Sequence, residues 1–186
     1  MLIHLIRHTT PDIAAGICYG QADIPLTANF AAEKDQVLTK LHGHYDALFC
    51  SPLSRCQLLA EHVSAGARFT EPRLLEYAFG DWELKPWSEL RSPDTQAWMD
   101  DFVNVPAPNG ESILMMQERV DEFFVELLQH DYDTVALVTH SGVQRLLHAR
   151  ILHTPLQHLF RLQLPFGAVI EVVHNQENQL QTVRHL

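Results

Sequence analysis

Short apolar runs alternate with longer segments of helical periodicity along this chain. Consecutive apolar residues at 2–6, 47–50 and 134–139 predict strands that are buried on both faces. Helical spacing of apolar residues predicts helices at 28–42, after Pro52 to about residue 63, at 111–129 and at 143–152. Thr27 is predicted as the N-cap of the first helix. Strands that alternate with helices in this way are typical of an α/β protein with a mainly parallel sheet.

Two parts of the chain show a weaker pattern. Residues 69–110 contain all three tryptophans and several prolines, and they predict two short helical stretches at most. The last strands are predicted at 168–173 and 179–186, as a closing hairpin around the polar residues 174–178. We therefore expect a three-layer α/β/α sandwich with a mainly parallel central sheet, formed by one domain that spans residues 1–186.

Composition and charge limit the partners and the compartment. The chain of 186 residues carries a formal net charge of −10, which argues against nucleic acid as its main partner. No window approaches the roughly 18 apolar residues of a membrane span, and the first residues do not form a signal peptide. Cys18, Cys50 and Cys56 have no metal-ligand spacing and indicate reduced thiols. We expect a cytoplasmic protein that binds neither a membrane nor nucleic acid.

Polar side chains follow three of the predicted strands where each strand ends. Arg7 and His8 follow the first strand, Arg55 comes shortly after the second, and His140 directly follows the third. Because ligands bind beyond the carboxyl ends of parallel strands, these side chains are expected at one edge of the sheet. Two guanidiniums bind a tetrahedral oxyanion well, and a histidine kept neutral by nearby cations can attack phosphorus. The remaining requirement is a carboxylic acid that protonates the leaving oxygen.

Five sequence motifs resemble those of the histidine phosphatase superfamily and occur in the same order. They are LIRHTTP at 5–11, CSPLSRCQLLAE at 50–61, LLEYAFGDWE at 74–83, PNGES at 108–112 and VTHSGV at 138–143. The resemblance is to the branch that includes phosphoglycerate mutases and small-molecule phosphatases, and it extends from residue 3 to about residue 172. It implies the phosphoglycerate mutase-like fold and a phosphorylated small molecule as substrate.

The resemblance also implies roles for individual residues. His8 would be the nucleophile that becomes phosphorylated, and Glu76 would be the proton donor and later the base that activates water. The rest of the implied phosphate pocket consists of Arg7, Arg55, His140 and the backbone N–H groups of Ser141 and Gly142. Members of this kind use no metal and no organic cofactor.

The loop GICYGQADIPLT at 16–27 narrows the expected substrate. It resembles the loop of the branch that hydrolyses α-ribazole 5′-phosphate in cobalamin biosynthesis. Tyr19, Gly20 and Gln21 are the candidates for substrate contact in this loop, with plain turn residues as the alternative. The sequence contains no basic cluster for a second phosphate, which favours a phosphatase over a mutase. The aromatic residues between 77 and 87 suit a base-like or sugar-like leaving group.

The sequence departs from the family pattern in four places. Thr9, Leu84 and Ser141 stand where the family usually has glycine, and no residue around Ala14 matches the further asparagine that contacts phosphate in the family. Arg145 and Arg150 lie outside these motifs. Both are predicted on a solvated face of the helix at 143–152.

Several alternatives stay open from the sequence. They are a broader sugar-phosphate or phosphoglycerate phosphatase, a phosphoglycerate mutase, and an inactive phosphatase-like binding module. A metal hydrolase would use His8, His140 and Glu76 as ligands, but the neighbouring arginines would repel a cation. The sequence also leaves open whether the protein is a homo-oligomer.

Overall fold

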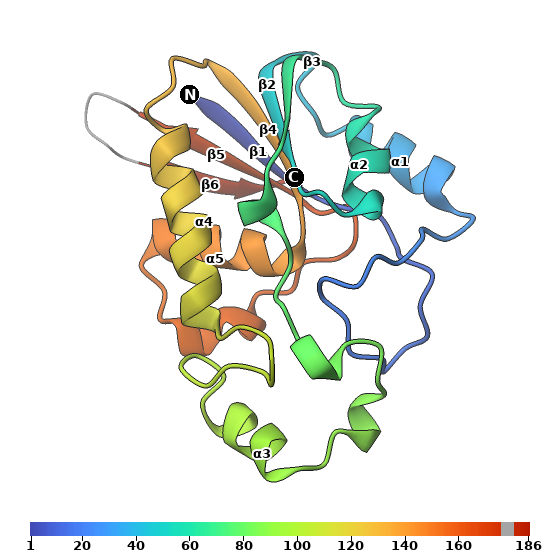
Figure 1. The fold of residues 1–186 in the computed structure, drawn as a ribbon. Helices are drawn as coiled ribbons and strands as arrows, with labels where there is room; N and C mark the ends of the chain where they lie inside the picture. Colours follow the sequence, from blue (N-terminus) through green and yellow to red (C-terminus); the bar gives the residue numbers. More distant parts are fainter. Residues whose placement is uncertain (176–180) are drawn as a thin grey trace.

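The computed structural model describes residues 1–175 and 181–186 (Figure 1). Its strands are β1 (Leu2–Arg7), β2 (Tyr45–Cys50), β3 (Ala65–Thr70), β4 (Thr134–Thr139), β5 (Val169–His174) and β6 (Gln181–His185). Its α-helices are α1 (Phe30–Leu38), α2 (Ser54–Ala60), α3 (Pro93–Asp100), α4 (Ile113–Leu127) and α5 (Ser141–Leu152). Short 3₁₀ helices are η1 (Pro72–Leu74), η2 (Gly80–Trp82), η3 (Trp87–Glu89) and η4 (Leu156–Arg161).

The strands described form one sheet in the order β3-β2-β4-β1-β5-β6. Strands β1 to β4 pair in parallel, whereas β5 runs antiparallel to β1 and β6 runs antiparallel to β5. This arrangement confirms the predicted mainly parallel sheet and the closing pair of C-terminal strands. The predicted polar turn at 174–178 lies, from residue 176 onward, outside the described residues.

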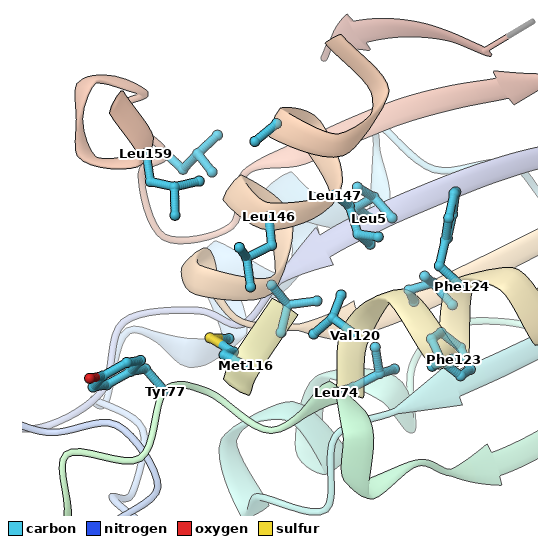
Figure 2. Close-up of a cluster of buried hydrophobic side chains, with 14 of the residues drawn as sticks. Leu5, Leu74, Tyr77, Met116, Val120, Phe123, Phe124, Leu146, Leu147 and Leu159 are labelled. Atoms are coloured by element: carbon cyan, nitrogen blue, oxygen red, sulfur yellow. The ribbon is translucent and has the colours of Figure 1, made fainter. Parts of the chain in front are cut away.

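Helices cover both faces of the sheet and give the expected three layers (Figure 1). Because side chains alternate along a strand, Leu5 of β1 joins the buried cluster under α4 and α5, whereas Ile6 joins a second cluster toward α1 and α2. Figure 2 shows Leu5 in the same cluster as Val120 of α4 and Leu147 of α5. Burial of both faces explains why β1 and β4 appear in the sequence as continuous apolar runs.

The neighbouring strands β1 and β4 lead the chain to opposite faces of the sheet. β1 continues to α1 on one face, and β4 continues to α5 on the other. In open α/β sheets, the point where the connections diverge leaves a crevice beyond the carboxyl ends of the strands. His8 follows β1 and His140 follows β4, and the backbone N–H of His8 donates to the carbonyl of Thr139 at 3.0 Å. Both histidines therefore lie at this crevice.

Two elements, β3 and α1, differ from the prediction. β3 was not predicted, because this edge strand has the sequence AGARFT, pairs only with β2 and exposes most of its side chains. The first helix is shorter than 28–42, and Asn29 rather than Thr27 precedes its first residue. Its predicted last turn is replaced by single turns, such as the bond from the Lys40 N–H to the Val37 carbonyl at 3.0 Å.

The prediction of at most two helical stretches in residues 69–110 is wrong. This segment contains η1, η2, η3 and α3. Short 3₁₀ turns have no apolar periodicity of their own, so the sequence pattern does not reveal them.

Leu84 has a left-handed backbone, and this conformation accounts for the glycine that the family usually has here. Its φ is 64°, which strains the backbone of a residue that has a Cβ atom. Its side chain is 59% exposed, so burial of the leucine side chain offsets little of this strain. We expect Leu84→Gly to raise the free energy of unfolding by about 0.5–1 kcal/mol, because glycine adopts positive φ without the side-chain clash. Urea denaturation would measure the change. Leu84→Ala keeps the Cβ atom and should give no gain, so equal stability of the Gly and Ala variants would contradict the assignment.

Candidate active site

Arg7 is the last residue of β1, and His8 extends from the end of the strand. The His8 Nδ1 lies 2.7 Å from the carbonyl oxygen of Thr9. Because a carbonyl only accepts, Nδ1 carries the proton, and Nε2 keeps its lone pair. The guanidinium of Arg7 donates from Nη1 to the Leu164 carbonyl and lies 3.9 Å from the centre of the Phe166 ring. These contacts fix both side chains at the crevice.

His8 is held in its neutral form. Its side chain is almost fully buried, and this burial is the main reason that its pKa lies well below the ordinary value of 6.5. The positive charges of Arg55 and Arg7 lower the pKa further. A neutral imidazole with a free Nε2 lone pair is a nucleophile, so the environment of His8 suits attack on an electrophilic centre.

Arg55 reaches the same site from the first turn of α2. It is completely buried, and its two terminal nitrogens donate to the backbone of the 16–27 loop. Nη1 donates to the Ala22 carbonyl at 2.8 Å, and Nη2 donates to the Gly20 carbonyl at 2.5 Å. Because these partners are neutral carbonyls, the buried guanidinium provides positive charge for an anionic ligand.

His140 lies behind His8 at the end of β4. The two rings contact edge to face with their centres 5.1 Å apart. The Nε2 of His140 lies 2.7 Å from the Ser51 hydroxyl and 3.5 Å from the Cys56 thiol. Burial, followed by His8 and the two arginines, lowers the pKa of His140 well below its ordinary value. Ser51 was not predicted as a site residue, although it directly follows β2 and thus lies at the same sheet edge.

Glu76 is held by the first turn of α5. The Gly142 N–H donates to both carboxylate oxygens at 3.1 Å, and the Ser141 hydroxyl donates at 3.3 Å. The Tyr77 N–H also donates to this carboxylate at 3.0 Å. A Cβ atom at position 142 would lie only 2.1 Å from the Glu76 carboxylate, so glycine is required there. The predicted N–H donor of Gly142 therefore binds Glu76.

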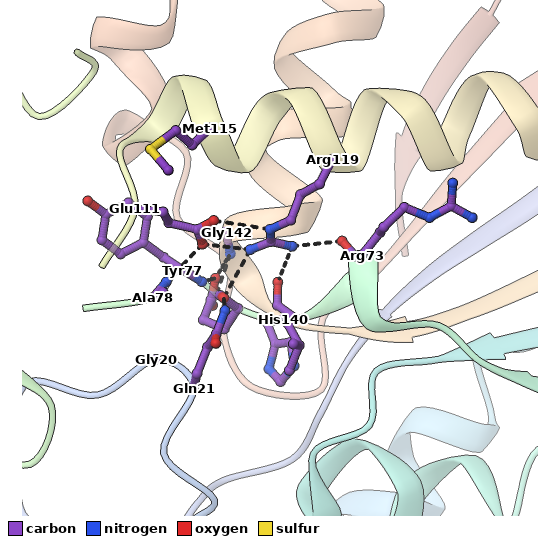
Figure 3. Close-up of polar contacts among 12 residues, drawn as sticks. Gly20, Gln21, Arg73, Tyr77, Ala78, Glu111, Met115, Arg119, His140 and Gly142 are labelled. Carbon is purple, nitrogen blue, oxygen red and sulfur yellow. Dashed lines mark hydrogen bonds and ion pairs between the residues drawn. The ribbon is translucent and has the colours of Figure 1, made fainter. Parts of the chain in front are cut away.

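A partly buried ion pair between Arg119 and Glu111 fixes the backbone that carries Glu76. Arg119 of α4 donates to the carbonyls of Leu75 at 2.8 Å and of Glu76 at 3.1 Å. Glu111 accepts from Arg119 at 2.7 Å, and it also accepts from the Ala78 N–H at 2.8 Å (Figure 3). The Glu111 of the PNGES motif thus acts on the segment that carries Glu76 rather than on a ligand.

The side chains line a single cavity whose lining combines two kinds of residue. The polar part of the lining consists of Arg7, His8, Arg55, Glu76, Ser141, Gly142 and Arg145. The aromatic and apolar part consists of Tyr19, Tyr77, Phe79, Trp98, Ile113, Met116 and Phe160. His140 is not among the described residues that line this cavity. The arrangement can hold an anionic group beside His8 and an aromatic or apolar group beyond it.

The three loop candidates lie in different places. Tyr19 lines the cavity, and the guanidinium of Arg55 lies 5.8 Å from its ring centre. Gly20 and Gln21 are not among the described lining residues. The Gly20 carbonyl accepts from Arg55, and the Gln21 side chain donates to the Glu76 carbonyl at 3.0 Å. Of the three candidates, Tyr19 is therefore the one placed to contact a ligand in the cavity.

Arg145 is a cavity residue, so its predicted position on a solvated face is wrong. It is partly buried, lines the cavity and donates from Nε to the Leu162 carbonyl at 3.1 Å. Burial lowers its pKa. Its position four residues after Ser141 was the available signal, because residues four apart share a helix face. Arg150 forms an ion pair with Asp121 at 3.0 Å.

Two negative findings apply to the part of the chain that the structure describes. In residues 1–175 and 181–186, no three or more His, Cys, Asp or Glu side chains form a group that could hold a metal ion. None of the helices in these residues combines the length and the apolar character of a bilayer span.

Comparison with known proteins gives one matching family and several similar phosphatases and mutases. The family model for the histidine phosphatase superfamily (branch 1) matches residues 3–185. An adenosylcobalamin/alpha-ribazole phosphatase of Escherichia coli (strain K12) is 32% identical over 187 aligned residues, which cover 95% of this chain and 92% of the relative. The crystal structure of the alpha-ribazole phosphatase from Shigella flexneri has a TM-score of 0.87 at 29% identity and covers 100% of this chain and 96% of that chain. A phosphoglycerate mutase from Thermus thermophilus has a TM-score of 0.74 at 28% identity, with coverage of 100% and 99%.

Proposed function

This chain belongs to the histidine phosphatase superfamily and is a phosphatase, and we propose that it hydrolyses α-ribazole 5′-phosphate through a phosphohistidine at His8. The observation that carries the substrate proposal is the cavity lining, in which charged side chains and the aromatic side chains of Tyr77, Phe79, Trp98 and Phe160 share one cavity. α-Ribazole 5′-phosphate has matching chemistry, since it is a ribose phosphate ester with an aromatic benzimidazole base. The names of the E. coli and S. flexneri relatives support the same substrate.

In the proposed first step, His8 displaces the alcohol from phosphorus. The Nε2 lone pair forms the N–P bond while the ester P–O bond breaks, and the Glu76 carboxyl gives its proton to the departing oxygen. In the second step, the Glu76 carboxylate takes a proton from water, and the water oxygen forms a bond to phosphorus as the N–P bond breaks. Inorganic phosphate leaves, and His8 returns to its neutral form.

Arg7 and Arg55 would bind the non-bridging phosphate oxygens in both steps. The Nε atoms of both arginines are buried and have no hydrogen-bond partner among the described residues. A buried N–H donor that lacks an acceptor costs about 1–3 kcal/mol, which phosphate oxygens would recover on binding. We assign the backbone N–H of Ser141 to the same oxygens, and His140 to the support of His8 from behind.

Phosphoglycerate mutase is the second candidate function. The T. thermophilus structure supports it, and Arg145 adds a third guanidinium to the cavity. A mutase must also hold the carboxylate or second phosphate of its substrate. The aromatic and apolar lining residues favour an aromatic group over a second anion, in agreement with the phosphatase activity.

A substrate panel with one truncated member tests the proposal. Phosphate release is measured for α-ribazole 5′-phosphate, ribose 5-phosphate and 3-phosphoglycerate, each with and without a chelator. We expect kcat/KM for α-ribazole 5′-phosphate to exceed that for ribose 5-phosphate by at least about 100-fold, because the missing base forfeits the aromatic contacts. Interconversion of phosphoglycerates faster than phosphate release would instead identify a mutase. Loss of activity in chelator with recovery in zinc would identify a metal hydrolase.

Phe160 offers a matched variant for the same panel. It lines the cavity, and its side chain is 49% exposed, so its removal does not empty the core. Phe160→Ala should raise KM for α-ribazole 5′-phosphate and leave the constants for ribose 5-phosphate unchanged. Equal effects on the two substrates would contradict the placement of the benzimidazole base against Phe160.

The protonation of His8 gives a prediction about pH. Because burial and two arginines hold its pKa well below 6.5, His8 should remain neutral at pH 6.5, where the imidazole of free histidine is half protonated. Activity that depends on neutral His8 is therefore lost only when the pH falls through this lowered pKa. A pH titration of the imidazole NMR signals, with His8→Gln for assignment, measures it. A midpoint at or above 6.5 would contradict the prediction.

A further inference from the structure

The carboxylate of Glu83, in the GDWE motif, receives four backbone N–H groups. Oε2 accepts from Gly20 at 2.9 Å and from Ala22 at 3.1 Å, while Oε1 accepts from Gln21 at 3.0 Å and from Phe79 at 3.1 Å. An ionised carboxylate has about four acceptor positions, so this one is fully used. Glu83 does not line the cavity among the described residues and has no role in the proposed reaction steps.

The same short loop binds Arg55 through its carbonyl groups. The carbonyl oxygens of Gly20 and Ala22 accept from the two terminal nitrogens of Arg55. Residues 20–22 therefore separate a carboxylate from a guanidinium, with N–H groups directed to one charge and carbonyl groups to the other. Peptide groups polarised in this way bind both charges more strongly than isolated ones.

We infer that Glu83 is a positioning residue for Arg55 and acts through the backbone of residues 20–22. The inference rests on the proposed function, in which Arg55 binds the phosphate. It also explains why Gly20 and Gln21, which were predicted to contact substrate, have their polar groups directed elsewhere.

The position of Arg55 depends closely on this loop. Its side chain is completely buried, and its terminal nitrogens donate to the Gly20 and Ala22 carbonyls. The loop is also tightly packed, since a Cβ atom at Gly20 would lie 1.8 Å from the carbonyl oxygen of Tyr77. Any shift of residues 20–22 away from Glu83 would therefore move the guanidinium that holds the phosphate.

Glu83→Gln tests the inference with little change in shape. The amide retains one acceptor oxygen, but its NH₂ group would face two N–H donors that the carboxylate now binds. We expect kcat/KM for p-nitrophenyl phosphate to fall by about 10–100-fold, and the inhibition constant of inorganic phosphate to rise, because a misplaced guanidinium weakens contact with phosphate. Glu89→Gln, an exposed change of the same charge six residues away, should leave both constants unchanged.

A double-mutant cycle separates positioning from a general structural effect. In an Arg55→Ala background, Glu83→Gln should change the residual kcat/KM by less than about twofold, because the group that it positions is absent. A loss by the same factor in both backgrounds, or no loss in the single variant, would overturn the inference. If Arg55→Ala itself left kcat/KM unchanged, the phosphate-binding role of Arg55 in the proposed function would fail as well. The two failures are thus distinguishable.

Discussion

His8→Ala should lower the turnover of α-ribazole 5′-phosphate by at least about 10⁴-fold, because it removes the atom that forms the bond to phosphorus. Water cannot easily replace the imidazole as the nucleophile, because His8 is buried beside Arg7, Arg55 and His140. In the proposed mechanism, the His8 Nε2 is the atom that attacks the bound ester. The assay is phosphate release under saturating substrate. His130→Ala, at an exposed histidine after α4, is the control and should retain full activity.

The covalent step has its own signature. Wild-type enzyme quenched in base during turnover should carry phosphate that is stable to alkali and labile to acid, as expected for a phosphorylated imidazole, and His8→Ala should carry none. The variant should still bind inorganic phosphate, because Arg7 and Arg55 are retained. Substantial turnover by His8→Ala, or labelled phosphate on that variant, would exclude the proposed nucleophile.

The sequence predicts the parts of this molecule that depend on local pattern. β1 and β4 are buried on both faces, so their apolar runs mark them, and the polar residues that follow them lie at the same edge of the sheet. The sequence alone therefore predicts that His8 and His140 belong to one site. β3 has neither the burial nor the apolar run, and no local signal distinguishes it from a loop.

The supporting contacts of the site could not be predicted in this way. Glu83 and Glu111 belong to recognised motifs, but their functions come from backbone groups that are distant in sequence, up to 63 residues away for Gly20 and Glu83. In the sequence, Arg145 looks like any exposed arginine of a helix. Its place in the cavity depends on η4, which packs beside α5, and on the hydrogen bond from its Nε to the Leu162 carbonyl. The identity of a residue does not reveal which hydrogen bonds its main chain forms, because every residue except proline offers the same donor and acceptor.

Glu76→Gln should slow the first turnover of α-ribazole 5′-phosphate by about 10²–10⁴-fold, which is the usual contribution of a positioned proton donor. The ribose alkoxide is a poor leaving group and needs the proton. p-Nitrophenolate does not, so the first turnover of p-nitrophenyl phosphate should slow by less than about tenfold. The amide nearly matches the carboxylate in shape and can still accept from the Gly142 N–H, so the geometry of the site should be retained. Rapid-quench and stopped-flow measurements give the two first-turnover rates.

The second step extends the test, because Glu76 would also be the base that activates water. With p-nitrophenyl phosphate, Glu76→Gln should release one equivalent of p-nitrophenol per site in a burst and then turn over slowly as phosphohistidine accumulates. Inorganic phosphate should inhibit the variant with an unchanged constant, since Arg7 and Arg55, not Glu76, bind its oxygens in the proposed site. Equal slowing of both first turnovers would mean that Glu76 supports the site without donating a proton. Its three donors from Tyr77, Ser141 and Gly142 would then be the reason for its position.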